Sequence, residues 1–365
     1  LMSAIRDMYD PVTVAITGTM GKTTTKELMH RAFAEQYETL CIEGNYNTVH
    51  TAGVVLQKLR PSDQAYIQEV HGGTKGWCSM TSRFVKPHIC VITSIDKGHI
   101  QQMGSIENII AEKMSIVDGL DADGVLILND DNGYLHEQNP SVRTVRYSMS
   151  DPTCDYHAKD ILDEGDRIRF TICCAEGEYP ALLNIQGLHN VGNALAVFAA
   201  GREAGIPPHR IIAGLARYAS DAIRQNVVDA YGYKLMLDCY NSNPTALLGA
   251  VRTLCGLPSL EGGRRIAVIG DMAELGEDTE RMHYEVGLEL GEEDVDAYFC
   301  YGPLCRRVAE GIRELGGVAY AFEDRAIFND ALSHFIKPKD SILFKASHGV
   351  HLFEETVVPL FGNIA

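Results

Sequence analysis

A short glycine-containing turn between an apolar run and a helical pattern constrains this chain most. Residues 12–17 (VTVAIT) have the apolar, β-branched composition of a buried strand, and residues 23–36 have the spacing of a helix. Gly18 and Gly21 stand between them. Backbone N–H groups in such a turn point into a concavity at the positive end of the helix, where an anion is stabilised. The turn therefore predicts a phosphate site on a strand–turn–helix unit.

The side chains of the turn suit a nucleoside triphosphate. Lys22 can reach the terminal phosphates, and the Thr23 hydroxyl can ligate magnesium. The longer form of this motif has a glycine five residues before Gly21, where this chain has Ile16, so the match is to a shorter form. A turn packed tightly for steric reasons alone is the alternative. We favour ATP binding, and the predicted residues are Gly18, Thr19, Gly21, Lys22, Thr23 and Thr24.

The rest of the chain predicts two α/β domains, as its length of 365 residues suggests. Strands and helices alternate up to residue 129, which favours a parallel sheet. Three β segments between residues 141 and 187 follow one another without helices and predict a small antiparallel extension. The α/β rhythm then resumes in a second, Rossmann-like domain. The predicted parts are a short N-terminal segment (1–10), a nucleotide-binding domain (11–220) and a C-terminal domain (221–365).

Charge and cysteine usage exclude several classes of protein. The chain has 32 Lys and Arg against 49 Asp and Glu, a net charge of −17, which disfavours binding to nucleic acid or anionic membranes. The ten cysteines form no CxxC, and several lie in apolar runs, so we expect reduced core residues rather than disulfides or a zinc site. No apolar run approaches the roughly 18 residues of a membrane span. We expect a cytoplasmic protein that acts on small molecules.

Several later stretches resemble the Mur ligases, which join carboxylates to amines in building the bacterial wall peptide. These stretches are GNYN (44–47), Glu69 after AYIQ, SIDKGHIQQMGSIENIIAEK (94–113), GLHNVGNALA (187–196), Arg224 in AIRQN, DCYNSNP (238–244), GDMAELGEDTERMH (270–283) and LFKAS (343–347). Within the family, the last three are most like the members that add D-alanyl-D-alanine. The resemblance covers nearly the whole chain from residue 11, and it implies an ATP-dependent acid–amine ligase.

The chemistry needs cations, because two anions must meet when the γ-phosphoryl group of ATP is transferred to a carboxylate. Magnesium takes oxygen ligands and prefers carboxylates together with phosphates. Glu69 ends the predicted strand 65–70, beside the strand that leads into the turn, and is placed to hold the ion. Lys22 of the turn and Glu69 are both predicted catalytic residues.

By resemblance, Lys113 is carbamylated by carbon dioxide and His99 is a further ligand, so that the two side chains help to bind a second magnesium ion. The sequence supports this role modestly, because Lys113 lies in a mostly apolar helical pattern where an unpaired ammonium is costly. A surface lysine whose stem covers apolar neighbours is the alternative.

The remaining candidates each have a structural alternative. Asn45 and Asn47 can contact phosphate or substrate, or simply form an Asx turn. The resemblance implies that Asn190 contacts adenine, although His189 and Asn190 can also cap a helix.

Arg224 can clamp phosphate, or form a surface ion pair. The resemblance implies that Asp238 binds the ribose hydroxyls. Lys345 and Ser347 end the last strand and are candidates for the carboxylate of the amine substrate, although serine also often caps helices.

Two departures from the family pattern leave other functions open. Mur ligases of this type begin with a domain that binds a UDP-sugar, whereas about ten residues precede the turn's strand here. Either the protein lacks that domain or this chain is a piece of a longer protein. Residues 70–80 (VHGGTKGWCSM) also differ from the family's usual sequence. The alternatives are a stand-alone Mur-like ligase acting on another acid, such as a nickel-tetrapyrrole carboxylate, and a non-catalytic nucleotide-binding subunit. A partner chain can supply substrate recognition in either case.

Overall fold

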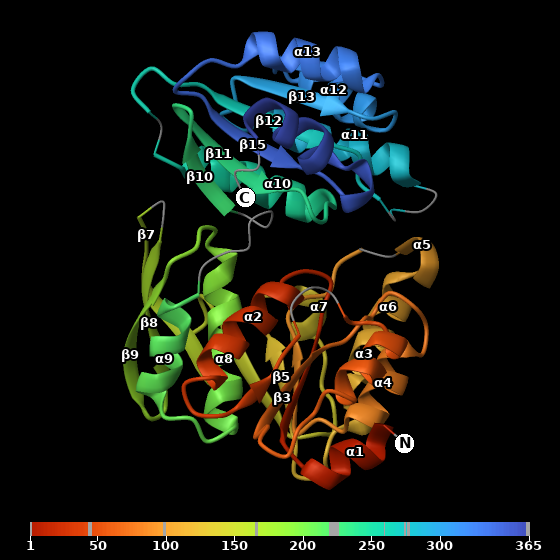
Figure 1. The fold of residues 1–365 in the computed structure, drawn as a ribbon, viewed down its shortest axis with the longest axis vertical. Coiled ribbons are helices and arrows are strands. Elements are labelled where there is room, and N and C mark those ends of the chain that lie inside the picture. The colour runs from red at the N-terminus through yellow and green to blue at the C-terminus, as the bar shows by residue number, and fades with distance from the viewer. Residues whose placement is uncertain are drawn as a thin grey trace. The chain divides into compact units, whose positions relative to one another are not determined.

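The computed structural model describes residues 2–42, 46–97, 100–164, 167–218, 226–258, 260–273, 275 and 278–362. The chain divides into two compact units (Figure 1). The first unit is Leu1–Asn184 with Leu188–Tyr218, and the second is Ile185–Gly187 with Ala219–Ala365. Each unit is built around its own sheet.

The first unit contains a nine-stranded sheet in the order β2-β3-β1-β4-β5-β6-β7-β8-β9. Its strands are β1 (Val12–Thr17), β2 (Thr39–Leu40), β3 (Ala65–Glu69), β4 (Ile89–Ile92), β5 (Val125–Asn129), β6 (Thr144–Ser148), β7 (Tyr156–Asp163), β8 (Ile168–Cys174) and β9 (Gly177–Leu183). The strands from β2 to β7 pair in parallel, and β7, β8 and β9 pair antiparallel. The predicted parallel sheet with an antiparallel extension is confirmed.

One detail of that prediction is wrong. The segment around residues 143–149 was expected in the antiparallel part, but β6 pairs in parallel with β5, because helix α7 (Gly133–His136) interrupts the connection between them. The extension begins instead with β7, whose alternation is weak, since its outer half is largely exposed.

Helices cover the faces of this sheet (Figure 1). They are α1 (Met2–Tyr9), α2 (Lys22–Phe33), α3 (Val49–Leu56), α4 (Trp77–Val85), α5 (Ile100–Met103), α6 (Ile106–Met114), α7, α8 (His189–Glu203) and α9 (Pro208–Ala216), with a 3-10 turn at Ser115–Gly119. Helix α8 is apolar around most of its circumference, and it packs against α2, α9 and the strands β4 to β8. Residues 2–9 form α1, which packs against α3 and α4.

The second unit contains a six-stranded sheet in the order β10-β11-β15-β12-β13-β14. Its strands are β10 (Asn226–Ala230), β11 (Tyr233–Asp238), β12 (Arg265–Gly270), β13 (Ala297–Tyr301), β14 (Ala319–Phe322) and β15 (Ser341–Lys345). Only β10, at the edge, runs antiparallel to its neighbour. The helices are α10 (Pro244–Gly256), α11 (Thr279–Gly291), α12 (Cys305–Glu314), α13 (Arg325–Phe335) and α14 (Val358–Phe361), with short turns of helix at His348–Val350 and Phe353–Val357.

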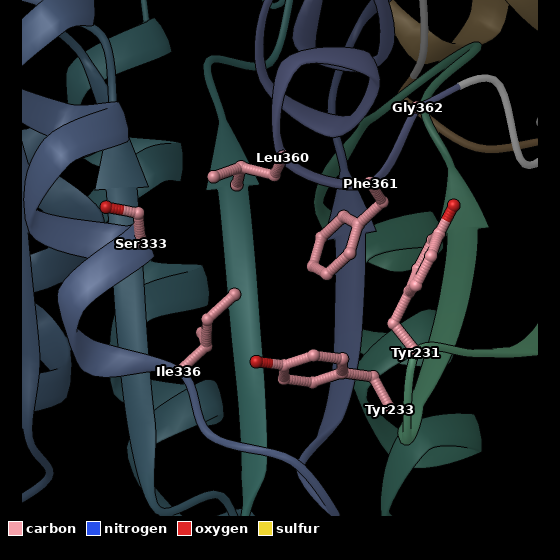
Figure 2. A pocket seen from close by; sticks show the side chains of 7 residues that line it. All are labelled: Tyr231, Tyr233, Ser333, Ile336, Leu360, Phe361 and Gly362. Carbon is pink, nitrogen blue, oxygen red and sulfur yellow. The ribbon is translucent and has the colours of Figure 1, made fainter.

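A cavity of about 420 Å³ opens in the second unit beside the β10–β11 hairpin (Figure 2). Tyr231 and Tyr233 line it together with Leu360 and Phe361, and the Tyr233 and Phe361 rings lie 5.3 Å apart. None of the predicted site residues that the structure describes lines this cavity. Among the described helices, none has the length and apolar character needed to cross a membrane.

Candidate functional site

The predicted phosphate turn joins β1 to α2 in the first unit, and its two glycines are required by close contacts. Gly18 has φ 151° and Gly21 has φ 80°, both in the region that side chains rarely adopt. A Cβ at Gly18 would lie 2.0 Å from the Thr93 hydroxyl, and one at Gly21 would lie 2.6 Å from Asn193 Oδ1. The turn therefore depends on these glycines for both its backbone and its packing.

The segment after β4 braces this turn. The Thr19 N–H donates to the Ser94 carbonyl (2.8 Å), the Met20 N–H donates to Ser94 Oγ (2.9 Å), and Thr93 Oγ1 donates to the Met20 carbonyl (2.5 Å). The Asp96 N–H donates to Thr19 Oγ1 (3.0 Å). The sequence pattern did not predict this role of Thr93, Ser94 and Asp96. Their position after a strand that neighbours β1 is the signal that could have found them.

Lys22 begins α2 and its ammonium folds back over the turn. Nζ donates to the carbonyls of Gly18 (2.6 Å) and Thr19 (3.0 Å). The first N–H groups of a helix have no carbonyl partner one turn earlier, so the turn carries positive character as well as this cation. Thr24 lies half-buried in the same first helical turn. This combination fits a polyphosphate.

A carboxylate stands beside the start of α2, as the sequence predicted. Glu69 is paired in register with Ile16 of β1, and its side chain is 3% exposed. Thr23 Oγ1 donates to Glu69 Oε2 (2.8 Å), and Asn47 Nδ2 donates to Glu69 Oε1 (2.8 Å). A hydroxyl and a carboxylate in contact at a helix N-terminus are oxygen donors of the kind that magnesium prefers, so these residues fit the ion.

Lys113 is buried against the loop that follows β3, the strand that ends at Glu69. It is 1% exposed, and Nζ donates to the Gly72 carbonyl (3.2 Å) in the loop that follows β3. Burial lowers the pKa of Lys113 to about 7, and the positive charge of Lys22 acts in the same direction. The alternative of a surface lysine is therefore wrong, because the ammonium does not reach solvent.

The residue before Lys113 fixes the loop that Lys113 touches. The Glu112 carboxylate accepts from the N–H groups of Gly76 (2.6 Å) and Cys78 (2.8 Å), at the start of α4. Because these N–H groups belong to the unsatisfied first turn of a helix, the carboxylate caps α4. Sequence analysis did not identify Glu112, although an acidic residue in a mostly apolar helical pattern is a signal for a buried partner.

Asn190 lies in the first turn of α8 and is 1% exposed. Its Oδ1 accepts from Asn193 Nδ2 (2.9 Å), and Asn193 in turn lies against Gly21. The residue that caps α8 is Leu188, without a side-chain hydrogen bond, so the alternative in which His189 and Asn190 cap this helix is wrong. Asn190 is thus linked to the phosphate turn through Asn193, which sequence analysis missed.

In the second unit, Asp238 and Lys345 form a buried ion pair. They are paired in register at the ends of β11 and β15, and Lys345 Nζ lies 2.7 Å from Asp238 Oδ2. Nζ also donates to the Asn241 carbonyl (2.5 Å). Ser347 Oγ accepts from the Ala273 N–H (3.1 Å) and donates to the Ser242 carbonyl (3.4 Å). Lys345 and Ser347 therefore hold together the loops at this end of the sheet.

Three predicted residues, Asn45, His99 and Arg224, lie outside the described residues. The structure brings the others together in two groups. The first unit holds the turn, Thr23, Asn47, Glu69, Lys113 and Asn190, and the second unit holds Asp238, Lys345 and Ser347.

Comparisons with known proteins identify the family of the chain. The sequence model of the Mur ligase middle domain matches residues 16–201, and that of the Mur ligase glutamate ligase domain matches residues 223–348. The chain is 33% identical over 346 residues to the UDP-N-acetylmuramoyl-tripeptide–D-alanyl-D-alanine ligase of Bacillus subtilis, covering 93% of this chain and 74% of that protein. It is 28% identical over 369 residues to the Escherichia coli enzyme of the same name, covering 100% of this chain and 80% of that protein.

The fold is similar to that of a solved structure of MurF from Acinetobacter baumannii. The TM-score is 0.91 at 26% identity, and the match covers 99% of this chain and 79% of that one.

Proposed function

The chain belongs to the Mur ligase family, and we propose that it joins D-alanyl-D-alanine to UDP-N-acetylmuramoyl-tripeptide, the reaction for which its Bacillus subtilis and Escherichia coli relatives are named. It is an ATP-dependent ligase, as its sequence predicted. The observation that carries the proposal is the contact between Thr23 and Glu69 beside the phosphate turn, with Lys113 buried near the same edge.

The proposed reaction has two steps. The bond between the γ-phosphorus and the bridging oxygen of ATP breaks as a bond to a substrate carboxylate oxygen forms, which gives ADP and an acyl phosphate. The neutral amine nitrogen then bonds to the acyl carbon, the bond between that carbon and the phosphate oxygen breaks, and phosphate leaves while the nitrogen releases a proton to solvent. Residues of this chain would bind and orient the anions: the N–H groups of the turn and Lys22 would bind the terminal phosphates.

Thr23 and Glu69 would hold magnesium. When bound, this ion would offset the negative charges of the ATP phosphates and of the substrate carboxylate. Thr23 contributes a hydroxyl oxygen, and Glu69 contributes a carboxylate that burial and its two hydrogen bonds keep in place. Lys22 would release its present carbonyl partners, Gly18 and Thr19, to reach phosphate oxygens.

Carbamylation of Lys113 is part of the proposal. A pKa near 7 leaves about half of the amines neutral at neutral pH, and the neutral amine is the form that attacks carbon dioxide. The product exchanges a costly buried ammonium for an anionic oxygen ligand, which would help to hold a second magnesium ion together with His99. Incubation with ¹³C-bicarbonate should give a carbamate carbon signal that Lys113→Met lacks.

The remaining assignments are also proposals. We infer that Asn190 lies near the adenine and that Arg224 contacts phosphate. We also infer that Asp238 binds the ribose while Lys345 supports it, because the two are already an ion pair. The part from residue 11 to 220 would bind ATP, and the part from 221 to 365 would complete the ligase. The cytoplasmic location of the protein stays a prediction. The involvement of a partner chain in substrate recognition also stays a prediction.

The alternatives named from the sequence have less support. A tetrapyrrole-modifying ligase and a non-catalytic subunit both remain compatible with a phosphate turn alone. Similarity over 93% and 100% of this chain to two enzymes of one name favours the D-alanyl-D-alanine ligase over either of them.

Phosphate release with purified substrates tests the proposal. Release should require ATP, UDP-N-acetylmuramoyl-tripeptide and D-alanyl-D-alanine together, with ADP as the nucleotide product, and Lys22→Ala should abolish it. Release of AMP and pyrophosphate, or turnover that is indifferent to the two acceptor substrates, would contradict it.

A further inference from the structure

We propose that Asn47 is a positioning residue, which fixes the carboxylate of Glu69 in the orientation that binds the metal ion. The inference rests on the proposed function, because it assigns Glu69 to a magnesium site. The expectation that Asn47 contacts phosphate or substrate stays a separate prediction.

The contacts of the Glu69 carboxylate carry the proposal. Thr23 donates to one oxygen and Asn47 to the other, each at 2.8 Å, and the side chain is 3% exposed. An ionised carboxylate only accepts hydrogen bonds, so the amide nitrogen of Asn47 must face it. Without Asn47, one buried oxygen would lose the donor that the structure gives it.

The backbone around Asn47 is anchored to the end of β3. The Asn47 carbonyl accepts from the His71 N–H (2.7 Å), and the Tyr46 carbonyl accepts from Gln68 Nε2 (2.9 Å). Gln68 is itself buried, and its Oε1 accepts from the Tyr66 hydroxyl. Residues 46 and 47 are thus tied to residues on both sides of Glu69.

The next residue fixes the other end of this short segment. Thr48 caps α3 by accepting from the Thr51 N–H, and Thr51 Oγ1 accepts from the Thr48 N–H in return. Asn47 therefore lies between a strand end and a helix start, both of which have defined positions. Its amide is preorganised to hold the Glu69 carboxylate before any ion binds.

An amide donor suits this task because it carries no charge. It holds one carboxylate oxygen without neutralising the negative charge that attracts the cation. A lysine or arginine at this position would neutralise that charge. Groups that orient metal ligands in this way typically contribute about 10- to 100-fold in metal affinity. A residue that contacts only the acid or the amine would contribute nothing to metal binding in their absence.

Binding of Mn²⁺ in the presence of ADP, followed by electron paramagnetic resonance without acid or amine, tests the inference. Asn47→Ala should weaken Mn²⁺ binding by about 10- to 100-fold. Asn47→Leu, which keeps the size of the side chain, should weaken it similarly and covers the case in which the alanine variant does not fold. Asn184→Ala is the matched control, because it removes an amide that donates to the Ala216 carbonyl and has no contact with Glu69 among the described hydrogen bonds. This variant should bind Mn²⁺ as the wild type does.

A second background shows whether Asn47 acts through Glu69. In Glu69→Asp the carboxylate is one methylene further from the amide, so adding Asn47→Ala should then change Mn²⁺ affinity by less than about twofold. The inference is overturned if Asn47→Ala and Asn47→Leu leave the Mn²⁺ affinity unchanged. It is also overturned if Asn47→Ala weakens Mn²⁺ binding in the Glu69→Asp background by the same factor as in the wild-type background. If wild-type protein with ADP does not bind Mn²⁺ at all, the proposed function fails and this inference fails with it.

Discussion

Lys113 shows how burial changes the protonation of a side chain. An ammonium that is 1% exposed loses its hydration, and Lys22 adds a second positive charge nearby, so the pKa falls to about 7 from the ordinary value of 10.5. The charged form therefore destabilises the folded protein. This cost is one reason for the proposal that Lys113 is carbamylated, because the carbamate would be an anion paired with bound magnesium rather than an ammonium without a counterion.

The cost should be measurable as a pH dependence of stability. Between about pH 7 and about 10.5 the folded state binds fewer protons at Lys113 than the unfolded state, so stability rises with pH across that window. Below about pH 7 the destabilisation of the folded state by the buried ammonium is fully present. In buffer free of carbon dioxide, urea unfolding at about pH 6 and about pH 10 should show that Lys113→Met loses this rise. The exposed Lys58→Met is the control, and an equal slope in wild type and Lys113→Met would contradict the prediction.

Some of the site could be predicted residue by residue, and some could not. Thr23 and Glu69 meet as expected, because the end of β3 must lie beside the turn after β1 in a parallel sheet. The contact of Asn47 with Glu69 depends on the path of an irregular segment, which no periodicity reveals. The ion pair of Asp238 and Lys345 needs the strand order β11-β15, which joins residues more than a hundred positions apart.

Among the elements, the phosphate turn also depends on the segment that follows β4. Thr93, the residue after β4, donates to the Met20 carbonyl within the turn itself. Thr93→Val keeps the shape but removes this donor, and loss of a hydrogen bond of this kind costs about 1 kcal/mol. ADP affinity should fall by about fivefold, whereas Thr93→Ser should retain it, as measured by calorimetry. Equal affinities in the two variants would show that the hydroxyl does not brace the turn.

The start of α4 offers a second test at this scale. Glu112 accepts two backbone N–H groups there, and hydrogen bonds to charged groups contribute about 1.5–3 kcal/mol each. Glu112→Ala should lower the free energy of unfolding by about 2–4 kcal/mol, and Glu112→Gln, which keeps one acceptor, by about half of that. Thermal and urea unfolding check both values. A loss below about 0.5 kcal/mol for the alanine variant would contradict the capping role.

Elements with strong periodicity could be predicted, and those stabilised by packing could not. The strand 12–17 and the helix after it follow directly from their residues. Helix α1 has a short and mixed sequence that is stabilised by contacts with α3 and α4, so its formation depends on tertiary structure. The parallel position of β6 likewise depends on the crossover through α7 rather than on its own alternation.

At the scale of the whole molecule, two units with separate cores predict unfolding in more than one step. The single tryptophan, Trp77, lies in the first unit, so its fluorescence reports that unit alone, whereas far-ultraviolet circular dichroism reports both. We expect the two transitions in guanidinium chloride to differ. Magnesium and ADP should shift the fluorescence transition to higher denaturant, since the phosphate turn lies in the same unit. Coincident transitions, unmoved by ADP, would contradict this expectation.

The pairing of Asp238 with Lys345 has a consequence for how the second unit assembles. If β11 docked one residue out of step with β15, both charges would be stranded in an apolar interior, each without its counterion. Misaligned intermediates would therefore be short-lived compared with those in a sheet whose strands are apolar to their tips. This ion pair would thus disfavour misaligned strands during folding, before any substrate is present.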